Sequence, residues 1–112
     1  MKYLMRVKMS KDSGNRNLID PEFGKKMREM LTEVKAENAY FTTIDGCRGA
    51  FIVVNIDNPS QIPAIAEPFF LWLNAEIDFY PVMSPDDLEK AAPAIEKAVK
   101  KWGMYVEQYS QV

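Results

Sequence analysis

The sequence contains no histidine, and this absence excludes several kinds of functional site. Without an imidazole there is no Ser-His-Asp triad, no Cys-His nucleophile pair, no HExxH zinc site and no histidine-ligated haem. Proton transfer near neutral pH would need a perturbed Asp, Glu, Lys, Tyr or Cys instead. We therefore expect no metal site and no cofactor, and any catalysis would rest on those other side chains.

Cysteine is also scarce, since Cys47 is the only one in 112 residues. A disulfide within the chain and a CxxC metal site are excluded, and an oxidising compartment is not indicated. The longest apolar stretch, residues 62–73, is too short to span a membrane and carries Pro63, Glu67 and Pro68. The first residues alternate and lack the continuous apolar stretch of a signal peptide. These features predict a cytoplasmic protein with no membrane partner.

The chain has no excess of positive charge either. It holds 14 Lys and Arg against 16 Asp and Glu, for a net charge of −2 at pH 7. Binding of nucleic acid relies on a concentrated basic surface. The longest basic runs are only the pairs 25–26 and 100–101, both on predicted helices among acids, which is typical of solvated faces. We expect no nucleic-acid partner.

What the chain does have is an ordinary globular composition, with 47% hydrophobic and 27% charged residues. Residues 2–9 alternate, and this period of two predicts a strand with Tyr3, Met5, Val7 and Met9 on its buried face. The other predicted strands are residues 39–44, 50–56 and 75–82. The glycines at residues 45–49 predict the turn of a β-hairpin.

Three segments have the apolar spacing of helices. The first begins at residues 20–22, where an N-cap aspartate precedes a proline, and runs to about Glu37. The second opens at Asn58 and must end or kink at Pro68, because proline lacks the backbone donor. The third, residues 85–102, contains a proline near its middle, so a kink or two short pieces are expected.

The order of elements is β-α-β-β-α-β followed by the terminal helix, an α+β pattern of the ferredoxin-like type. In that fold the four antiparallel strands lie in the order 4-1-3-2, with both main helices on one face. We expect one domain, residues 1–103, that includes the terminal helix 85–102. Residues 104–112 are expected to be a tail that docks on a neighbour. Residues 11–17 are polar and contain a glycine, which predicts a loop.

Two helices cover only one face of such a sheet, so the other face must be solvated or covered by something else. The side chains predicted to point to that second face mix charge with apolar groups: Leu4, Arg6, Lys8, Phe51, Val53, Glu76, Asp78 and Tyr80. A face of this kind is not typical of a surface left in water. Pairing of two copies through this face would cover it, so we expect a homodimer, and the pattern leaves higher oligomers open.

Two stretches carry a resemblance to a known group of proteins. One is the Asp45-Gly46 turn with the strand that follows it, and the other runs from Ser60 to Tyr80. On these residues the chain resembles the dimeric α/β-barrel superfamily, in which two ferredoxin-like protomers pack their sheets into a barrel. It is most similar to small muconolactone-isomerase-like proteins and related families of unknown function. The resemblance covers roughly residues 2–83.

That resemblance implies a fold more than an activity. The superfamily includes isomerases, cofactor-free monooxygenases, haem-degrading enzymes and proteins with no known reaction, and it supplies no catalytic residue for this chain. The missing histidine argues against the haem-ligating members.

The candidate site residues come from the predicted open face. Strands one and four are neighbours in the expected order, so Arg6 and Lys8 can lie opposite Asp78 and Glu76 and form charge-assisted bonds. One interpretation is a polar patch that orients a small anionic or phenolic ligand, with Glu76 or Asp78 as the proton-transfer group. The alternative is a cross-strand ion-pair network, or pairing across the dimer.

Aromatic residues complete the predicted site. With Arg6, we expect Phe51, Trp72 and Tyr80 to line a ligand pocket, although aromatic residues are equally typical of core or dimer contacts. Three functions stay open. The missing catalytic constellation favours a homodimeric small-molecule-binding barrel without strong catalysis. The alternatives are a cofactor-free isomerase or monooxygenase, acting on a small cyclic or aromatic metabolite with a carboxylate base, and an interaction module that recruits a partner.

Overall fold

The structure is a computed structural model of the chain, and it describes residues 1–106. These residues form four strands, β1 (Lys2–Met9), β2 (Asn38–Ile44), β3 (Cys47–Asn55) and β4 (Ala75–Pro81). The same range forms the helices α1 (Lys11–Leu18), α2 (Phe23–Glu33), α3 (Ile62–Leu73), α4 (Pro85–Lys90) and α5 (Ala92–Trp102), and the short 3₁₀ helix η1 (Pro59–Gln61).

The contacts divide the chain into two compact units, Met1–Val82 and Met83–Val112. The first unit holds the sheet with α1, α2 and α3, and the second holds α4 and α5. The expected domain bounds, residues 1–103, stay a prediction. Residues 104–106 are helical, and the rest of the expected docking tail, residues 107–112, lies outside the described residues.

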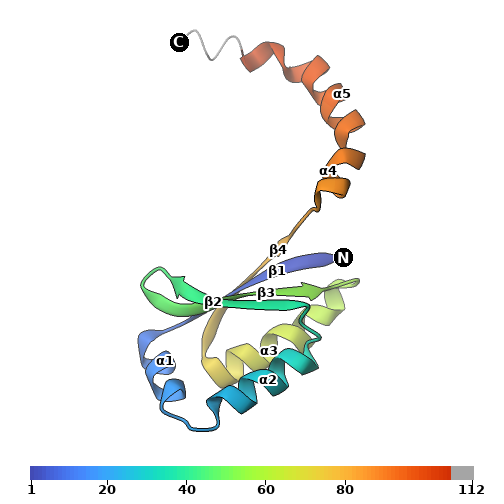
Figure 1. The fold of residues 1–112 in the computed structure, drawn as a ribbon. Helices are drawn as coiled ribbons and strands as arrows, with labels where there is room; N and C mark the ends of the chain where they lie inside the picture. The colour runs from blue at the N-terminus through green and yellow to red at the C-terminus, as the bar shows by residue number, and fades with distance from the viewer. Residues whose placement is uncertain (107–112) are drawn as a thin grey trace. The chain divides into compact units, whose positions relative to one another are not determined.

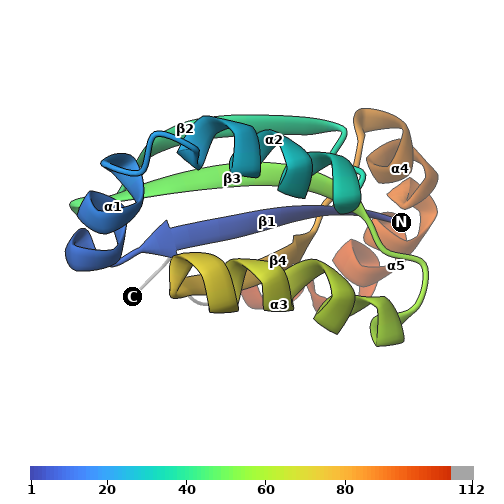
Figure 2. The same cartoon turned by 90° about the horizontal axis from the view of Figure 1, so that it is seen from below.

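The sheet is antiparallel throughout and has the order β2-β3-β1-β4, which reads 4-1-3-2 from the β4 edge. All three helices of the first unit lie on one side of it (Figures 1 and 2). This arrangement leaves the opposite side of the sheet, here called the open face, without a helix in residues 1–82.

The strand alternation predicted from the sequence is confirmed. Met5 and Val7 of β1 are 0% and 3% exposed, while Ile52 and Val54 of β3 are fully buried on the same side. They pack with Phe69 of α3 in the hydrophobic core between the sheet and the helices. Because side chains of a strand alternate, their sequence neighbours must point to the open face.

The turn between β2 and β3 is shorter than the predicted turn of residues 45–49. Asp45 and Gly46 alone make it, with φ values of 50° and 78°. Two successive residues with positive φ close a two-residue hairpin whose twist matches that of the strands. Cys47, Arg48 and Gly49 therefore belong to β3, where Cys47 pairs with Ile44.

The prediction of a loop at residues 11–17 is wrong, because this segment forms helix α1. The Ser10 hydroxyl caps this helix by accepting a hydrogen bond from the Ser13 backbone N–H at 3.1 Å. Ser13 itself is 2% exposed, and its hydroxyl donates to the backbone carbonyl of Leu73 at the end of α3. A polar sequence therefore becomes helical because a tertiary contact holds it against α3.

Helix α2 is shorter than predicted at both ends. Asp20 does not cap the helix; its Oδ1 accepts from the Glu22 N–H at 2.9 Å in a turn, and the helix begins at Phe23. At the other end the helix stops at Glu33 rather than about Glu37, because Lys35 takes a positive φ of 54°.

The sequence predicted that helix α3 would end or kink at Pro68. The helix continues past Pro68 to Leu73, so the proline does not end it. The helix ends at Asn74, which has a φ of 49°. It is introduced by η1, where Asn58 and Gln61 form a reciprocal capping box.

The C-terminal unit begins as predicted. Ser84 and Asp87 form a capping box at the start of α4, and the chain breaks into α4 and α5 at Ala91, two residues before Pro93. Neither helix contains a buried residue.

Candidate functional site

The open face is organised in three rows of side chains that run across the strands. The register places Leu4 between Val53 and Tyr80, Arg6 between Phe51 and Asp78, and Lys8 between Gly49 and Glu76. The cross-strand opposition that the sequence predicted for the two cations and the two acids is therefore confirmed. Charged and apolar rows lie next to each other on this face.

A cluster of five charged side chains forms one end of the open face. The guanidinium of Arg6 lies 3.3 Å from Asp78 Oδ2 and 2.8 Å from Asp45 Oδ2. The Nζ atom of Lys8 lies 3.6 Å from Glu76 Oε2 and 4.0 Å from Asp45 Oδ2. Asp45 thus bridges the two cations.

The charge balance of this cluster decides which ligands it can take. Two cations face three carboxylates, so the cluster has a net charge of −1 and already satisfies its own cations. The side chains of Arg6 and Lys8 are only 20% and 23% exposed, whereas the three carboxylates are 54–74% exposed. An anion would have to displace a carboxylate, so the geometry favours a neutral ligand that hydrogen-bonds to oxygen atoms.

At the other end of the open face, Glu37 accepts a hydrogen bond from the Asn55 side chain at 2.5 Å and lies 3.3 Å from Lys2 Nζ. The hydrogen bond from Asn55, and then the contact with Lys2, lower the pKa of the Glu37 carboxyl. These two contacts connect Glu37, the residue before β2, to the end of β3 and the start of β1.

Three of the four predicted ligand-binding residues come together. Arg6, Phe51 and Tyr80 all lie on the open face, with Tyr80 46% exposed. Tyr40 of β2 stands opposite Phe51 and extends the aromatic surface.

Trp72 does not join them. It lies on α3, on the helix side of the sheet, and its ring packs against Phe23 of α2 with the centroids 5.5 Å apart. The prediction grouped it with the open-face residues because both are aromatic. The 3.6-residue period of α3, however, directs Trp72 toward the neighbouring helix.

Asp45 is the member of the charged cluster that sequence reasoning missed. Asp45 lies in a tight turn, where aspartate is common because it tolerates a positive φ. The backbone conformation is therefore enough to account for an aspartate at this position. Only the ion-pair contacts of the folded chain show that this turn lies beside Arg6 and Lys8. The signal that could have pointed to it is an Asp-Gly turn at the start of β3, the strand that pairs with β1.

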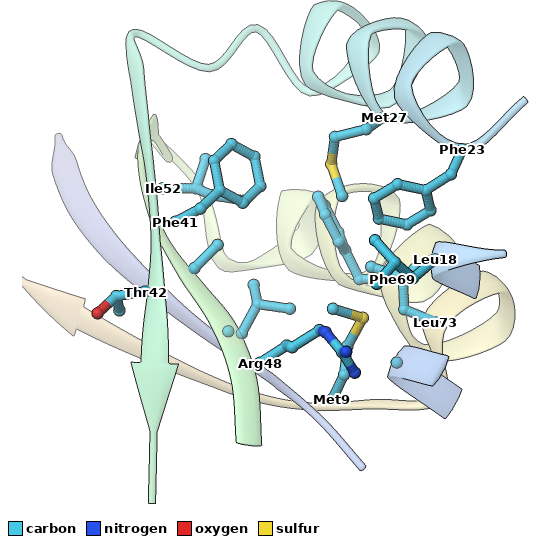
Figure 3. Close-up of a pocket in the computed structure, with 14 residues that line it drawn as sticks. Met9, Leu18, Phe23, Met27, Phe41, Thr42, Arg48, Ile52, Phe69 and Leu73 are labelled. Atoms are coloured by element: carbon cyan, nitrogen blue, oxygen red, sulfur yellow. The ribbon is translucent and has the colours of Figure 1, made fainter. Parts of the chain in front are cut away.

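A cavity of about 170 Å³ lies on the helix side of the sheet, and it was not predicted. Figure 3 shows side chains from the sheet, α1, α2 and α3 around it. Its lining is Val7, Met9, Gly14, Leu18, Phe23, Met27, Phe41, Thr42, Arg48, Gly49, Ala50, Ile52, Phe69 and Leu73. The sheet separates this cavity from the open face.

Within residues 1–106, no group of three or more acidic or cysteine side chains is arranged to hold a metal ion. In that same range no helix has both the length and the apolar character needed to cross a membrane.

Comparison with known proteins places the chain in a family without assigning it an activity. No curated protein matches it. Residues 1–106 match a family described as "Domain of unknown function (DUF3303)". The match spans almost the whole chain, and the chain therefore belongs to the DUF3303 domain family.

Proposed function

We propose that the protein is a homodimeric small-molecule-binding protein, in which two ferredoxin-like protomers pair their open faces into an α/β barrel. The observation that carries this proposal is the composition of the open face. Leu4, Phe51 and Val53 form an apolar strip that is only partly buried, and charged residues border it. In residues 1–82, every helix lies on the other side of the sheet.

This distribution resembles the anatomy of protein interfaces. A typical interface has an apolar centre enriched in aromatic residues and a polar rim. Here Phe51 is central, while Tyr40 and Tyr80 are 61% and 46% exposed. A second copy would remove these rings from water, and the gain from burying a large apolar side chain is roughly 1.5 to 3 kcal/mol.

The expected ligand follows from the charged cluster. Between two packed sheets the ion pairs of Arg6 and Lys8 would lose water, so each charge must keep its partner. A neutral ring with a hydroxyl or carbonyl group, such as a phenol or a cyclic ketone, could hydrogen-bond to the cluster without adding charge. Phe51 and the tyrosines would contact the ring.

The experiment is sedimentation equilibrium of the full chain over a range of concentrations. We expect a dimer for the unaltered protein and a monomer for Phe51→Glu, since the new charge would lie at the centre of the interface. Leu71→Glu is the matched control, because Leu71 is 82% exposed on α3 and away from the open face. A monomeric unaltered protein, or a dimer that survives Phe51→Glu, refutes the proposal.

Ligand binding is tested on the same dimer with phenol and cyclohexanone as probes. NMR shift changes in the side chains of Arg6, Phe51 and Tyr80 are expected. Shift changes confined to other parts of the chain would refute a ligand site on this face.

A second candidate function is a cofactor-free isomerase or monooxygenase. The register favours it, because Asp78 and Glu76 each stand opposite a cation that could orient a substrate. Both carboxylates are more than half exposed in one protomer, so a second copy would have to exclude water from them. Turnover of unsaturated lactones or hydroquinones should be lost in Glu76→Gln or Asp78→Asn; turnover that persists in both variants excludes a carboxylate base.

We also propose a closer family relation and a cellular location for the protein. The closer likeness to muconolactone-isomerase-like proteins is supported by the sequence resemblance, and the cytoplasmic location is supported by the single cysteine.

A further inference from the structure

The helix-side cavity has the properties of a binding site that is separate from the open face. Its inner wall includes Ile52 and Phe69, both 0% exposed, and its rim includes Leu18 and Phe41, which are 58% and 61% exposed. Figure 3 shows these side chains arranged around a common space. The cavity is therefore apolar inside and opens past apolar side chains that face water.

The volume sets the size of a ligand. A dry apolar cavity of about 150 Å³, lined by residues such as Leu, Ile and Phe, is large enough for benzene. The present cavity of about 170 Å³ can therefore hold a single six-membered ring.

Among the described residues that line the cavity, Arg48 provides the one charged group. Its Nη1 atom donates a hydrogen bond to Asn15 Oδ1 of α1 at 2.8 Å. In the described part of the chain no carboxylate lies within ion-pair distance of this guanidinium, in contrast to Arg6 on the open face. The remaining N–H donors of Arg48 therefore have no anionic partner from residues 1–106.

Gly14 of α1 makes this position of Arg48 possible. A Cβ atom at Gly14 would lie 3.1 Å from Arg48 Nη1 and 3.4 Å from Arg48 Cδ. The missing side chain thus lets the guanidinium lie against α1 at the edge of the cavity, where it is also held by Asn15.

We propose that this cavity binds a monocyclic carboxylate, with the ring inside the cavity and the carboxylate at the guanidinium of Arg48. An arginine and a carboxylate form charge-assisted hydrogen bonds, often two in parallel. The bound ring would also cover the exposed side chains of Leu18 and Phe41. The site is complete within one protomer, so it does not depend on dimerisation.

The test uses the full-length chain labelled with ¹³C at its methionine methyl groups, because Met9 and Met27 both line the cavity. Benzoate is the charged probe and toluene is the neutral probe. Benzoate should shift the methyl signals of Met9 and Met27. Arg48→Gln should weaken benzoate binding about tenfold, which matches the loss of one charge-assisted interaction, and should leave toluene binding unchanged.

Arg16→Gln is the matched control, since Arg16 is an exposed cation on α1, the helix that Arg48 lies against, and does not line the cavity. It should leave the affinity for benzoate unaltered. Ala50→Leu should fill the cavity and abolish binding of both probes. If Ala50→Leu does not fold, the comparison of Arg48→Gln with Arg16→Gln still decides the question.

The outcomes also separate this site from the open-face site. The Phe51→Glu variant should bind benzoate whether or not it dimerises. Absence of shifts at Met9 and Met27, or equal benzoate affinity in Arg48→Gln and the unaltered protein, overturns the inference.

Discussion

The Nη2 atom of Arg6 lies 2.8 Å from Asp45 Oδ2, although 39 positions separate the two residues in the chain. Arg6 is near the middle of β1, and Asp45 is in the turn that joins β2 to β3. The register of β3 with β1 ends where Gly49 lies opposite Lys8, and the turn beyond it brings its carboxylate to the charged row of the open face.

Asp45→Asn should lower the free energy of unfolding by less than about 1 kcal/mol, because Asp45 is 70% exposed and surface ion pairs contribute little. Asparagine keeps the turn, since it tolerates the positive φ of 50°. Urea denaturation at low salt measures the loss, which should disappear at high salt. Asp45→Ala is the comparison: it should cost about 1 kcal/mol more through backbone strain. A salt-independent loss for Asp45→Asn would contradict this account.

Gly49→Ala should destabilise the protein by about 1 to 3 kcal/mol. A Cβ atom there would lie 2.5 Å from Ile44 Cδ1 and 2.8 Å from the Val7 carbonyl oxygen, and the backbone atom cannot move away. Gly24→Ala in α2 is the control, because a Cβ there meets nothing within 4 Å. It should be neutral or stabilise the helix by up to about 1 kcal/mol. Thermal unfolding of both variants is the measurement, and similar values for the two would contradict the packing argument.

Ser13→Ala should cost about 1 to 3 kcal/mol, because it removes the hydroxyl that donates to the Leu73 carbonyl in a buried position. This bond holds α1 against the end of α3. Hydrogen exchange should therefore increase first at the backbone amides of α1. Unchanged exchange in α1 together with full stability would show that another contact fixes this helix.

Asp20 should make stability depend on pH in the acid range. The backbone N–H of Glu22, and then the ammonium of Lys26 at 2.9 Å, lower the pKa of the Asp20 carboxyl below its ordinary value of 3.8. A lowered folded-state pKa means that the stabilisation is complete above the unfolded value and is lost as the pH falls through the folded value. We expect the free energy of unfolding to decrease below about pH 3.8.

Asp20→Asn is the variant that checks this dependence. Asparagine can still accept the hydrogen bond from Glu22, but it does not titrate. Denaturant unfolding between pH 2 and 6 should therefore show a smaller acid decrease for the variant than for the unaltered protein. Identical pH profiles would show that other carboxyls cause the whole effect.

Local patterns in the sequence were sufficient for much of the fold. The alternation in residues 2–9 identified both faces of β1, and the apolar spacing that predicted a helix from residue 85 identified the start of α4. The strand order then placed Arg6 opposite Asp78 without any knowledge of coordinates. These features depend on neighbouring residues, or on a register that the side-chain period of two determines.

Other features depend on contacts between distant residues, and only the tertiary structure decided them. Helix α1 forms in a polar segment because Ser13 bonds to Leu73, 60 positions away. Asp45 joins the charged cluster, and Trp72 leaves the predicted site, because of how strands and helices pack. The sequence by itself determined which way most side chains point. The structure decided what each of them meets, because a local pattern carries no information about the group on the other side of a contact.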